Sequence, residues 1–334
     1  MTPNERGTRW TSWLRKQWFL GGLLLALVAG SLLAEPLEWL ADHAGWRGVI
    51  VFVVMFLMSA PLETRVVGRT LRRPLPALLA TLVSFVVVPL YALAGSQWLD
   101  PESARGLLVV AATPCTLASA AVWTNRAGGN EVVALMTTVV TNAICFVVTP
   151  LLIVWTTGLS AGISAGEMSL RLLGLVLVPL ALGQCVRLIN PLSRLASQHK
   201  PLWYGVAQIG VLLMVFTGTV KTWNLLPAGS TFPVSTLMTV TLVCMLVHLL
   251  ALASGFQLAR LLGRNRGEQI AVGIAGSQKT LMVGLLVCLM LQVSLVPMVI
   301  YHVVQLLLDT LIADRWARST RGQPVPHQSA RGKP

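Results

Sequence analysis

The chain is dominated by apolar segments that recur along nearly its whole length and are separated by short polar connectors. A helix needs about 20 apolar residues to cross the hydrocarbon core of a bilayer. Within that core, only helices and closed barrels satisfy every backbone hydrogen bond. Segments of suitable length, alone or closely paired, lie at residues 17–34, 46–62, 75–97, 105–124, 130–157, 168–189, 203–223, 234–260, 268–290 and 294–316. The sequence therefore predicts an all-α membrane protein with ten transmembrane helices.

The composition excludes several classes of protein. Charged residues make up 11% of the chain, whereas a soluble protein carries about 25%. The net charge of +13 does not indicate a nucleic-acid partner, because Lys and Arg lie in connectors rather than along one helix face. The chain has no P-loop, as a nucleotide-driven pump would, and no Asp pair at membrane depth, so we expect no enzyme activity. The five cysteines lie singly in apolar runs, which favours buried thiols and neither a metal site nor a cofactor.

The basic residues predict the orientation in the membrane, because cytoplasmic connectors are enriched in Lys and Arg. One side would carry Arg6, Arg9, Arg15, Lys16, Arg65, Arg69, Arg72, Arg73, Arg126, Arg187, Arg194, Lys200, Arg260, Arg264, Arg266, Arg315, Arg318, Arg321, Arg331 and Lys333. The other side would carry only Arg47, Arg105, Arg171 and Lys221, together with six acidic residues. We therefore expect an integral protein of the plasma (inner) membrane, with both termini in the cytoplasm.

Two of the segments contain helix-breaking residues. Pro114 removes a helix hydrogen bond in the fourth segment, and Gly276 and Ser277 lie in the ninth. Interrupted helices at corresponding positions of two halves indicate an inverted repeat whose binding site lies between the halves. The sequence thus predicts a first five-helix repeat over 17–157 and an inverted second repeat over 168–316. A cytoplasmic N-terminus (1–16) and a disordered tail (317–334) would flank them, although two unrelated irregularities would leave the same pattern.

Lys279 directly follows the second break and has no other charged residue near it in the sequence. A cation near the centre of a membrane helix costs roughly 2.5–3.5 kcal/mol on insertion scales. Two roles can offset such a cost. The ammonium could bind the substrate or take part in proton binding, or it could donate hydrogen bonds to carbonyl groups that the broken helix leaves open.

Further polar residues lie in the apolar segments at positions that could line a site. Thr138, Thr141 and Asn142 share a helix face, where they could either hydrogen-bond to a neighbouring helix or line the site. His302, Gln305 and Asp309 also share a face, and His302 could act as a proton relay. Asp309 could instead pair with a terminal Arg, and a structural role is expected for His248. The candidate substrate- or ion-binding residues are Thr113, Pro114, Thr116, Ser119, Thr138, Asn142, Ser277, Gln278, Lys279, Thr280, His302 and Gln305.

At these residues the chain resembles the bile acid:sodium symporter superfamily, and in particular its SBF-like branch, which includes the seventh member of vertebrate solute carrier family 10. The resemblance is carried by residues 127–131, 276–281 and 296–305. It implies a ten-helix fold in which the first, second, sixth and seventh helices form a panel domain. The other six helices would form a core domain, in which the broken fourth and ninth helices cross.

The sequence departs from the sodium-coupled relatives at most sodium-liganding positions. The resemblance places Ile274 where those relatives have a liganding Glu, Ser84 where they have Gln, and Ala134 where they have Ser. The positions that match are Ser119, Thr138 and Gln278. Because Lys279 could supply the charge of a bound cation, we expect no firm dependence on sodium, and Na⁺ or H⁺ would be the coupling ion.

Taken with the broken helices, the resemblance predicts a secondary active transporter. Its substrate would be a small organic anion, such as a bile-acid-like or other carboxylate or sulfate, moved by alternating access. The expected partners are this anion and the lipid bilayer, without nucleic acid. The alternative is a membrane regulator of calcium homeostasis that does not itself transport, a role with which the seventh-member branch is associated.

Overall fold

The computed structural model describes residues 18–39, 44–62, 74–158, 163–224 and 233–321, and its regular secondary structure there is entirely helical. In chain order the helices are α2 (Trp18–Leu32), α4 (Ala44–Ser59), α6 (Leu75–Leu82), η1 (Val83–Val87), α7 (Val88–Ser96), α8 (Pro101–Ala112), α9 (Ser119–Arg126), α10 (Glu131–Thr157), α11 (Ala165–Leu172), η2 (Leu173–Leu177), α12 (Val178–Val186), α13 (Asn190–Gln198), α14 (Lys200–Asn224), α15 (Val234–Leu261), α16 (Arg266–Ser277), α17 (Leu281–Leu291) and α18 (Val296–Arg321). The predicted all-α class is confirmed for this part of the chain.

Seven helical stretches within the described residues are long and apolar enough to cross a membrane, judged by length and composition. They are Leu75–Ser96, Glu131–Thr157, Ala165–Val186, Lys200–Asn224, Val234–Leu261, Arg266–Leu291 and Val296–Arg318. The apolar helices Gly21–Leu32 and Gly45–Ser59 are shorter, and the segment predicted at 105–124 is divided between α8 and α9. The protein is therefore a helical membrane protein, whereas the count of ten crossings stays a prediction.

One helix and one helix boundary differ from the predictions. Helix α13 was not expected, because its sequence is too short and too polar to register as an apolar segment. Pro191 lies in its first turn, where the missing N–H is harmless. Helix α18 continues to Arg321, beyond the predicted end of the second repeat at residue 316. The predicted N-terminus (1–16) and the tail after residue 321 lie outside the described residues.

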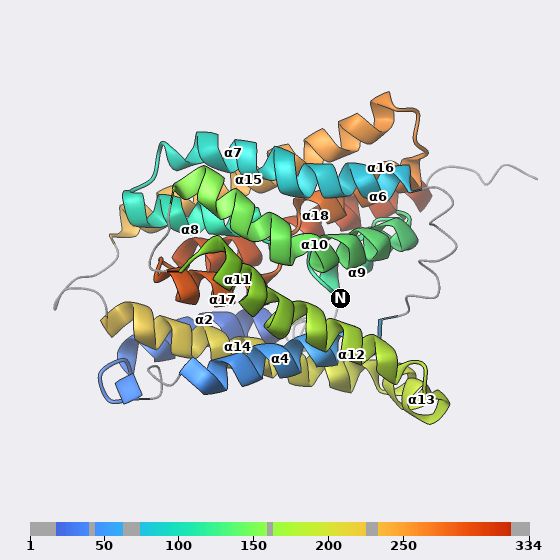
Figure 1. Cartoon of the computed structure of the whole chain (residues 1–334). Coiled ribbons are helices and arrows are strands. Elements are labelled where there is room, and N and C mark those ends of the chain that lie inside the picture. Colours follow the sequence, from blue (N-terminus) through green and yellow to red (C-terminus); the bar gives the residue numbers. More distant parts are fainter. Residues whose placement is uncertain (1–17, 40–43, 63–73, 159–162, 225–232, 322–334) are drawn as a thin grey trace, which may run out of the picture.

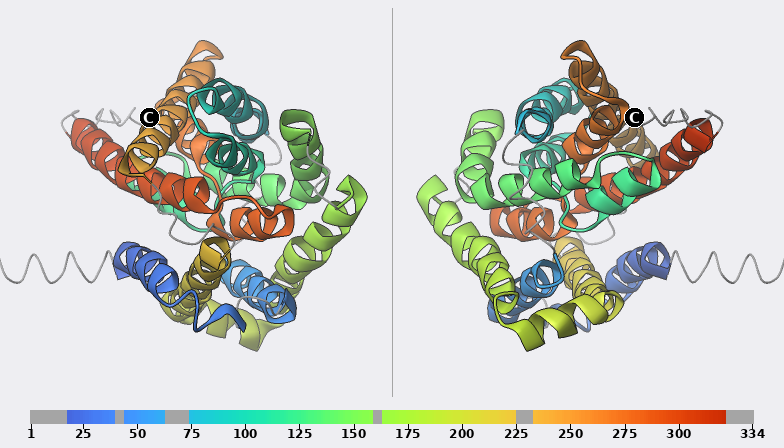
Figure 2. Two further views of the ribbon diagram at one scale, coloured as in Figure 1. Left: turned by 90° about the vertical axis from the view of Figure 1, so that its left-hand side faces the viewer. Right: turned by 90° about the vertical axis from the view of Figure 1, so that its right-hand side faces the viewer.

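The helices form two layers (Figure 1), one of α2, α4, α12, α13 and α14 and one of α6 to α10 with α15 to α18. In the first layer, α14 contacts both α2 and α4, and α12 contacts α4. The continuous helix from α11 through η2 to α12 connects the layers, since it contacts α10 near its beginning and α4 farther along. End-on views show the same separation (Figure 2). This grouping agrees with the panel and core domains that the family resemblance implies.

Helices α15 and α16 pack together most closely where both carry glycine. A Cβ atom added at Gly255 would lie 2.9 Å from the carbonyl oxygen of Val272, and one at Gly273 would lie 2.9 Å from that of Leu252. Small residues let membrane helices approach each other to this distance, so that dispersion contacts between backbones become effective. The pair brings α15 against the end of α16, where the second break begins.

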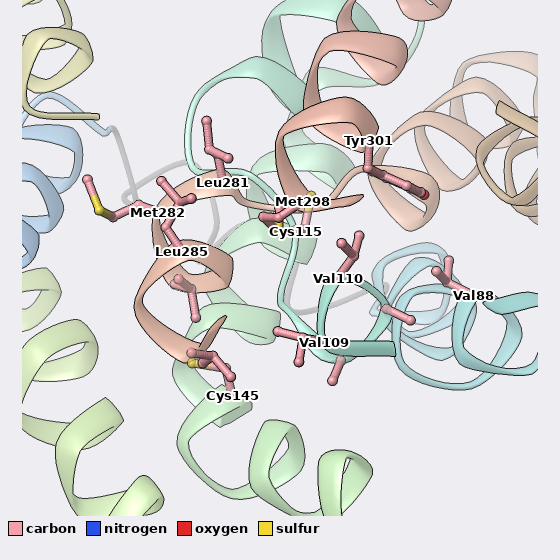
Figure 3. Packing of buried hydrophobic residues seen from close by; sticks show 14 of the residues in the cluster. Val88, Val109, Val110, Cys115, Cys145, Leu281, Met282, Leu285, Met298 and Tyr301 are labelled. Carbon is pink, nitrogen blue, oxygen red and sulfur yellow. The ribbon is translucent and has the colours of Figure 1, made fainter. Parts of the chain in front are cut away.

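A dry apolar cluster surrounds the two breaks. Leu281 and Leu285 of α17 lie beside Met298 of α18, with Cys115 of the first break and Val110 of α8 next to them (Figure 3). All five residues are buried. An apolar surrounding leaves unpaired polar groups with no water to bond to, so every polar atom of the breaks must find a partner within the protein.

The predicted orientation can be tested with single exposed cysteines. We would introduce Gln97→Cys and Arg194→Cys, both at exposed positions, in a protein whose exposed native Cys185 is replaced by Ser. An impermeant maleimide added outside intact cells should label position 97 and leave position 194 unlabelled until the membrane is opened. Labelling of position 194 from outside would contradict the predicted topology.

Candidate functional site

The two broken helices meet at their breaks. Helix α8 ends at Ala112 and α9 begins at Ser119, while α16 ends at Ser277 and α17 begins at Leu281. The backbone between them is extended, as at Thr113 (φ −78°, ψ 155°). The two segments are joined directly, because the amide of Thr280 donates to the carbonyl of Pro114 at 2.9 Å. The predicted irregularities therefore lie side by side in the fold.

Polar side chains of α10 satisfy the backbone of the first break. Thr149 donates to the carbonyl of Ala112 at 2.7 Å, Asn142 to that of Cys115 at 2.9 Å, and Thr138 to that of Thr116 at 2.9 Å. These carbonyls would otherwise lack partners, since Pro114 prevents α8 from continuing. The polar face of this helix thus makes hydrogen bonds to the first break, and Asn142 also lines a separate cavity of about 170 Å³.

Side chains of α18 do the same for the second break. Gln305 brackets Lys279, because its Oε1 accepts from the Lys279 amide at 2.9 Å and its Nε2 donates to the Lys279 carbonyl at 3.0 Å. The hydroxyl of Tyr301 donates to the carbonyl of Ser277 at 2.9 Å. Gln305 Nε2 also lies 2.9 Å from His302 Nδ1. The amide of Gln305 thus replaces the backbone partners that the broken helix has lost.

The Lys279 ammonium joins three separate parts of the chain. Its Nζ donates to the carbonyl of Ser84 at 2.6 Å and to the Ser84 hydroxyl at 3.0 Å. It also donates to the carbonyls of Ala111 and Thr113, each at 2.8 Å. We call these four oxygen atoms the oxygen cage. The side chain is completely buried, and the ring of Phe85 lies 5.4 Å from Nζ, close enough for a cation–π contribution.

The carbonyl of Ser84 is free for this role because of a π-helical turn. In η1, the amide of Val88 donates to the carbonyl of Val83, five residues back. The carbonyl of Ser84 would then take its partner from residue 89, which is a proline and has no N–H. Such π turns are frequent at functional sites. At the end of α8, the carbonyl groups also carry the negative end of the helix dipole, which favours a cation.

Gln278 connects the two breaks through side chains. Its Oε1 accepts from Thr116 at 2.8 Å and from Ser119 at 2.9 Å. Its Nε2 donates to a carboxylate oxygen of Asp309. The other oxygen of Asp309 lies 3.0 Å from His248 Nε2, and both of these side chains are completely buried. The network runs from α15 through α18 and the second break to α9.

Asp309 corrects one prediction. The alternative that Asp309 pairs with a terminal Arg is wrong, since its partners are His248 and Gln278. Asp314 makes an ion pair with Arg126 instead. A structural role for His248 stays a prediction. His248 faces Asp309, and its ring packs edge-on against Tyr301 with centroids 5.8 Å apart.

A cavity of about 620 Å³ lies between the two layers and reaches Ser119. It is lined by Phe19, Pro61, Leu62, Leu117, Ala118, Ser119, Ala121, Val122, Trp123, Glu131, Val132, Leu135, Lys200, Tyr204, Gln208 and Leu306. A smaller cavity of about 110 Å³ shares part of this lining and adds Thr116, Thr280, Leu281 and His302. Together they extend from Lys200 to the starts of α9 and α17.

The candidate residues divide into two groups. Those that line these two cavities are Thr116, Ser119, Thr280 and His302. Those that brace the breaks are Thr113, Pro114, Thr138, Asn142, Ser277, Gln278, Lys279 and Gln305. Lys279 is not among the lining residues, so the structure gives it the carbonyl-binding arrangement rather than contact with a cavity.

Sequence reasoning missed several residues of the site. Ser84 and Thr149 supply partners to the breaks, while Phe19, Tyr204 and Gln208 line the larger cavity. Of these, only Ser84 carried a signal, because Pro89, five residues later in the same apolar helix, has no N–H to donate. The others lie far from the breaks in sequence and reach them through helix packing.

Comparison with known proteins finds one family model and several relatives that match most of the chain. The model of the SBF-like CPA transporter family matches residues 17–318. The uncharacterized protein PA2026 of Pseudomonas aeruginosa is 28% identical over 88% of this chain and 92% of its own length. The sodium/bile acid cotransporter 7-B of Xenopus laevis is 25% identical over 90% and 91%. The uncharacterized sodium-dependent transporter YocS of Bacillus subtilis is 25% identical over 92% and 93%.

Removal of the Lys279 ammonium should destabilise the protein. In Lys279→Met, the carbonyl oxygens of the cage lose their donor within an apolar surrounding, which should lower the stability on the order of 3 kcal/mol. The control Lys221→Met removes a Lys that is only partly buried and should leave the stability nearly unchanged. We would compare the melting temperatures in one detergent. Equal melting temperatures for Lys279→Met and wild type would contradict the bracing role.

Proposed function

Because the chain belongs to the SBF-like CPA transporter family, we propose that it is a secondary active transporter of a small organic anion that works by alternating access. The names of its relatives include a sodium/bile acid cotransporter and a sodium-dependent transporter. Those names describe the relatives. For this chain, the substrate class and the mechanism are proposed on its own cavity and charges.

The observation that carries the proposal is the cavity between the layers, which ends at two helix amino-termini. Ser119 begins α9 and Leu281 begins α17, and both residues line the smaller cavity. The amino end of a helix carries a partial positive charge and unsatisfied N–H groups, which favour an anion. Half-helices that point at an anionic substrate are typical of transporters with broken helices.

The rest of the lining supports an amphipathic anion. The hydroxyls of Ser119 and Thr280 lie beside these helix ends. Thr280 can donate a hydrogen bond to a carboxylate or sulfonate, and Ser119 can do so when its hydrogen turns away from Gln278 Oε1. Phe19, Leu117 and Leu135 provide apolar surface in the larger cavity, which suits a hydrocarbon body such as that of a bile acid. A membrane regulator without transport activity would not need such a cavity at a helix break.

The membrane topology in this proposal is that of ten crossings in two inverted halves. The larger cavity is lined by Lys200 near the start of α14 and by Glu131 at the start of α10. The Lys and Arg distribution favours a cytoplasmic location for these ends. The conformation described here would then be open toward the cytoplasm. The membrane in this proposal is the plasma or inner membrane of the cell.

A sodium ion, which the relatives' names imply, does not fit the residues present. Sodium needs several oxygen atoms with free lone pairs. Gln278 Oε1 already accepts from both Thr116 and Ser119, Thr116 Oγ1 accepts from the Ala120 amide, and the carbonyl of Thr116 accepts from Thr138. The position expected to carry a liganding carboxylate is Ile274, which is completely buried. The fixed ammonium of Lys279 supplies one positive charge to the open carbonyls nearby. We therefore propose that transport does not require sodium.

Transport should depend on the cavity. The change Ala118→Phe places a ring at a residue that lines both cavities and should abolish the uptake of radiolabelled taurocholate into proteoliposomes. The matched change Ala94→Phe lies at an exposed position of α7 and should preserve uptake. Equal uptake by both variants would contradict the cavity as the route.

Wild-type uptake should be equal in sodium and choline buffers. A tenfold gain in taurocholate affinity with sodium, about 1.4 kcal/mol, would contradict sodium independence.

The oxygen cage should bind a free cation once the tethered one is removed. Lys279→Ala leaves the cage oxygens and a space where the side chain was, so sodium, potassium or methylammonium should raise the melting temperature of the variant, because a ligand that binds only the folded state stabilises it. Choline, which is too large, should not. Wild type and Lys221→Ala should respond to none of these cations. A variant whose melting temperature is the same in all four salts would contradict the substitution of a tethered ammonium for a bound cation.

A further inference from the structure

His248 and Asp309 are a buried titratable pair that the proposed anion site does not use. They come from α15 and α18, have no exposed surface, and their Nε2 and Oδ1 atoms lie 3.0 Å apart. Neither lines the cavities described above. Ionisable residues at membrane depth are expensive and usually serve ion or proton movement. A structural pair alone would gain more from well-packed apolar residues.

The pair has one vacant place for a proton. With a hydrogen on Nε2, His248 donates to Asp309, and its Nδ1 then carries a lone pair and no hydrogen. This Nδ1 is buried and has no hydrogen-bond partner. A proton taken up from water at Nδ1, without any covalent bond to another group, would convert a net negative pair into a neutral ion pair. The nitrogen can therefore accept a proton, and the neighbouring carboxylate would balance the charge of the resulting imidazolium.

A direct chain of hydrogen bonds links the pair to the cavity. Gln278 donates to Asp309 with Nε2, and its Oε1 accepts from Thr116 and Ser119. If the added proton instead resides on the Asp309 oxygen that faces Gln278, while His248 keeps its hydrogen on Nε2, that oxygen becomes a donor, and the Gln278 amide can turn so that Oε1 accepts from it. The Gln278 amide would then donate toward Thr116 and Ser119, and these hydroxyls would become free to donate to an anion. Proton occupancy thus reverses the polarity of the hydroxyls at the start of α9.

The surrounding groups do not provide another proton site in direct contact with the pair. The titratable and charged groups with described side chains on the elements packed against it are Tyr301, His302, Asp314, Arg315 and Arg318 of α18, Cys244 and Arg260 of α15, Arg266 and Glu268 of α16, Lys279 of the second break, Cys288 of α17, Tyr91 of α7, Glu102 and Arg105 of α8, and Arg126 of α9. Tyr301 touches the ring of His248 but donates its proton to the carbonyl of Ser277. Arg126 and Asp314 pair with each other at an exposed position.

We propose that His248 and Asp309 form a proton-binding site whose occupancy is transmitted through Gln278 to the anion-binding hydroxyls, so that the proton is the coupling ion of transport. This proposal rests on the proposed transport function. The pair is closed to solvent in the conformation described, and alternating access would expose it to water during the cycle. A tethered ammonium at Lys279 and a movable proton at the pair would together replace bound sodium.

The test uses the full chain in lipid nanodiscs and in proteoliposomes, with variants that keep the hydrogen bonds and remove the titration. Asp309→Asn and His248→Gln retain a side chain that can reach the same partner. The matched control is Asp314→Asn on the same helix, at an exposed position. Proton uptake in nanodiscs would be followed with a pH indicator after a small addition of acid. The pH would be kept above the range in which exposed carboxylates titrate. Taurocholate exchange and pH-driven uptake would be measured in proteoliposomes.

Wild type and Asp314→Asn should take up about one proton more per chain than either pair variant. A pH gradient should stimulate taurocholate uptake in wild type and the control, whereas the pair variants should exchange taurocholate without responding to the gradient. Wild-type proton uptake by both folded variants would overturn the proposal, as would gradient-stimulated uptake by them. If Asp309→Asn does not fold, His248→Gln decides. Wild type that titrates as expected but never moves any anion would refute the proposed function and leave the proton site standing.

Discussion

The structure depends on one interaction, the contact between the Lys279 ammonium and the oxygen cage. Two helices stop inside an apolar core, and their open carbonyls have no water to bond to. The ammonium supplies hydrogen bonds to two segments at once, namely the π turn at Ser84 and the end of α8 at Ala111 and Thr113. The insertion cost of a buried cation is offset because several buried oxygens would otherwise remain unpaired.

The remaining polar side chains of the core follow from the same requirement. Thr138 and Asn142 of α10, and Gln305 and Tyr301 of α18, each complete a backbone group that a broken helix leaves open. With the backbone braced in this way, the amino ends of α9 and α17 remain directed at the cavity between the layers. A rigid crossing beside a cavity between two groups of helices is what alternating access between rigid bodies requires.

The sequence allowed much of this architecture to be predicted. Apolar segments and helix breakers located the helices and both breaks, and the motifs at residues 276–281 and 296–305 indicated the family, which the comparisons confirmed. The alternative roles of Lys279 could not be separated, because an isolated charge in an apolar run does not reveal which atoms surround it. The pair of His248 and Asp309 was missed for a similar reason. These residues lie on different helices, and only the packing of α15 against α18 brings them together.

The central claim is that the tethered ammonium of Lys279 fills an oxygen cage that could otherwise hold a free cation. The most direct measurement is a crystal structure of Lys279→Ala soaked in thallium(I), a monovalent cation with strong anomalous scattering. The account predicts an anomalous peak within bonding distance of the carbonyl oxygens of Ser84, Ala111 and Thr113, and no such peak in wild type. A variant without a peak at this position would contradict it, as would a wild-type structure in which the Lys279 ammonium points into the cavity.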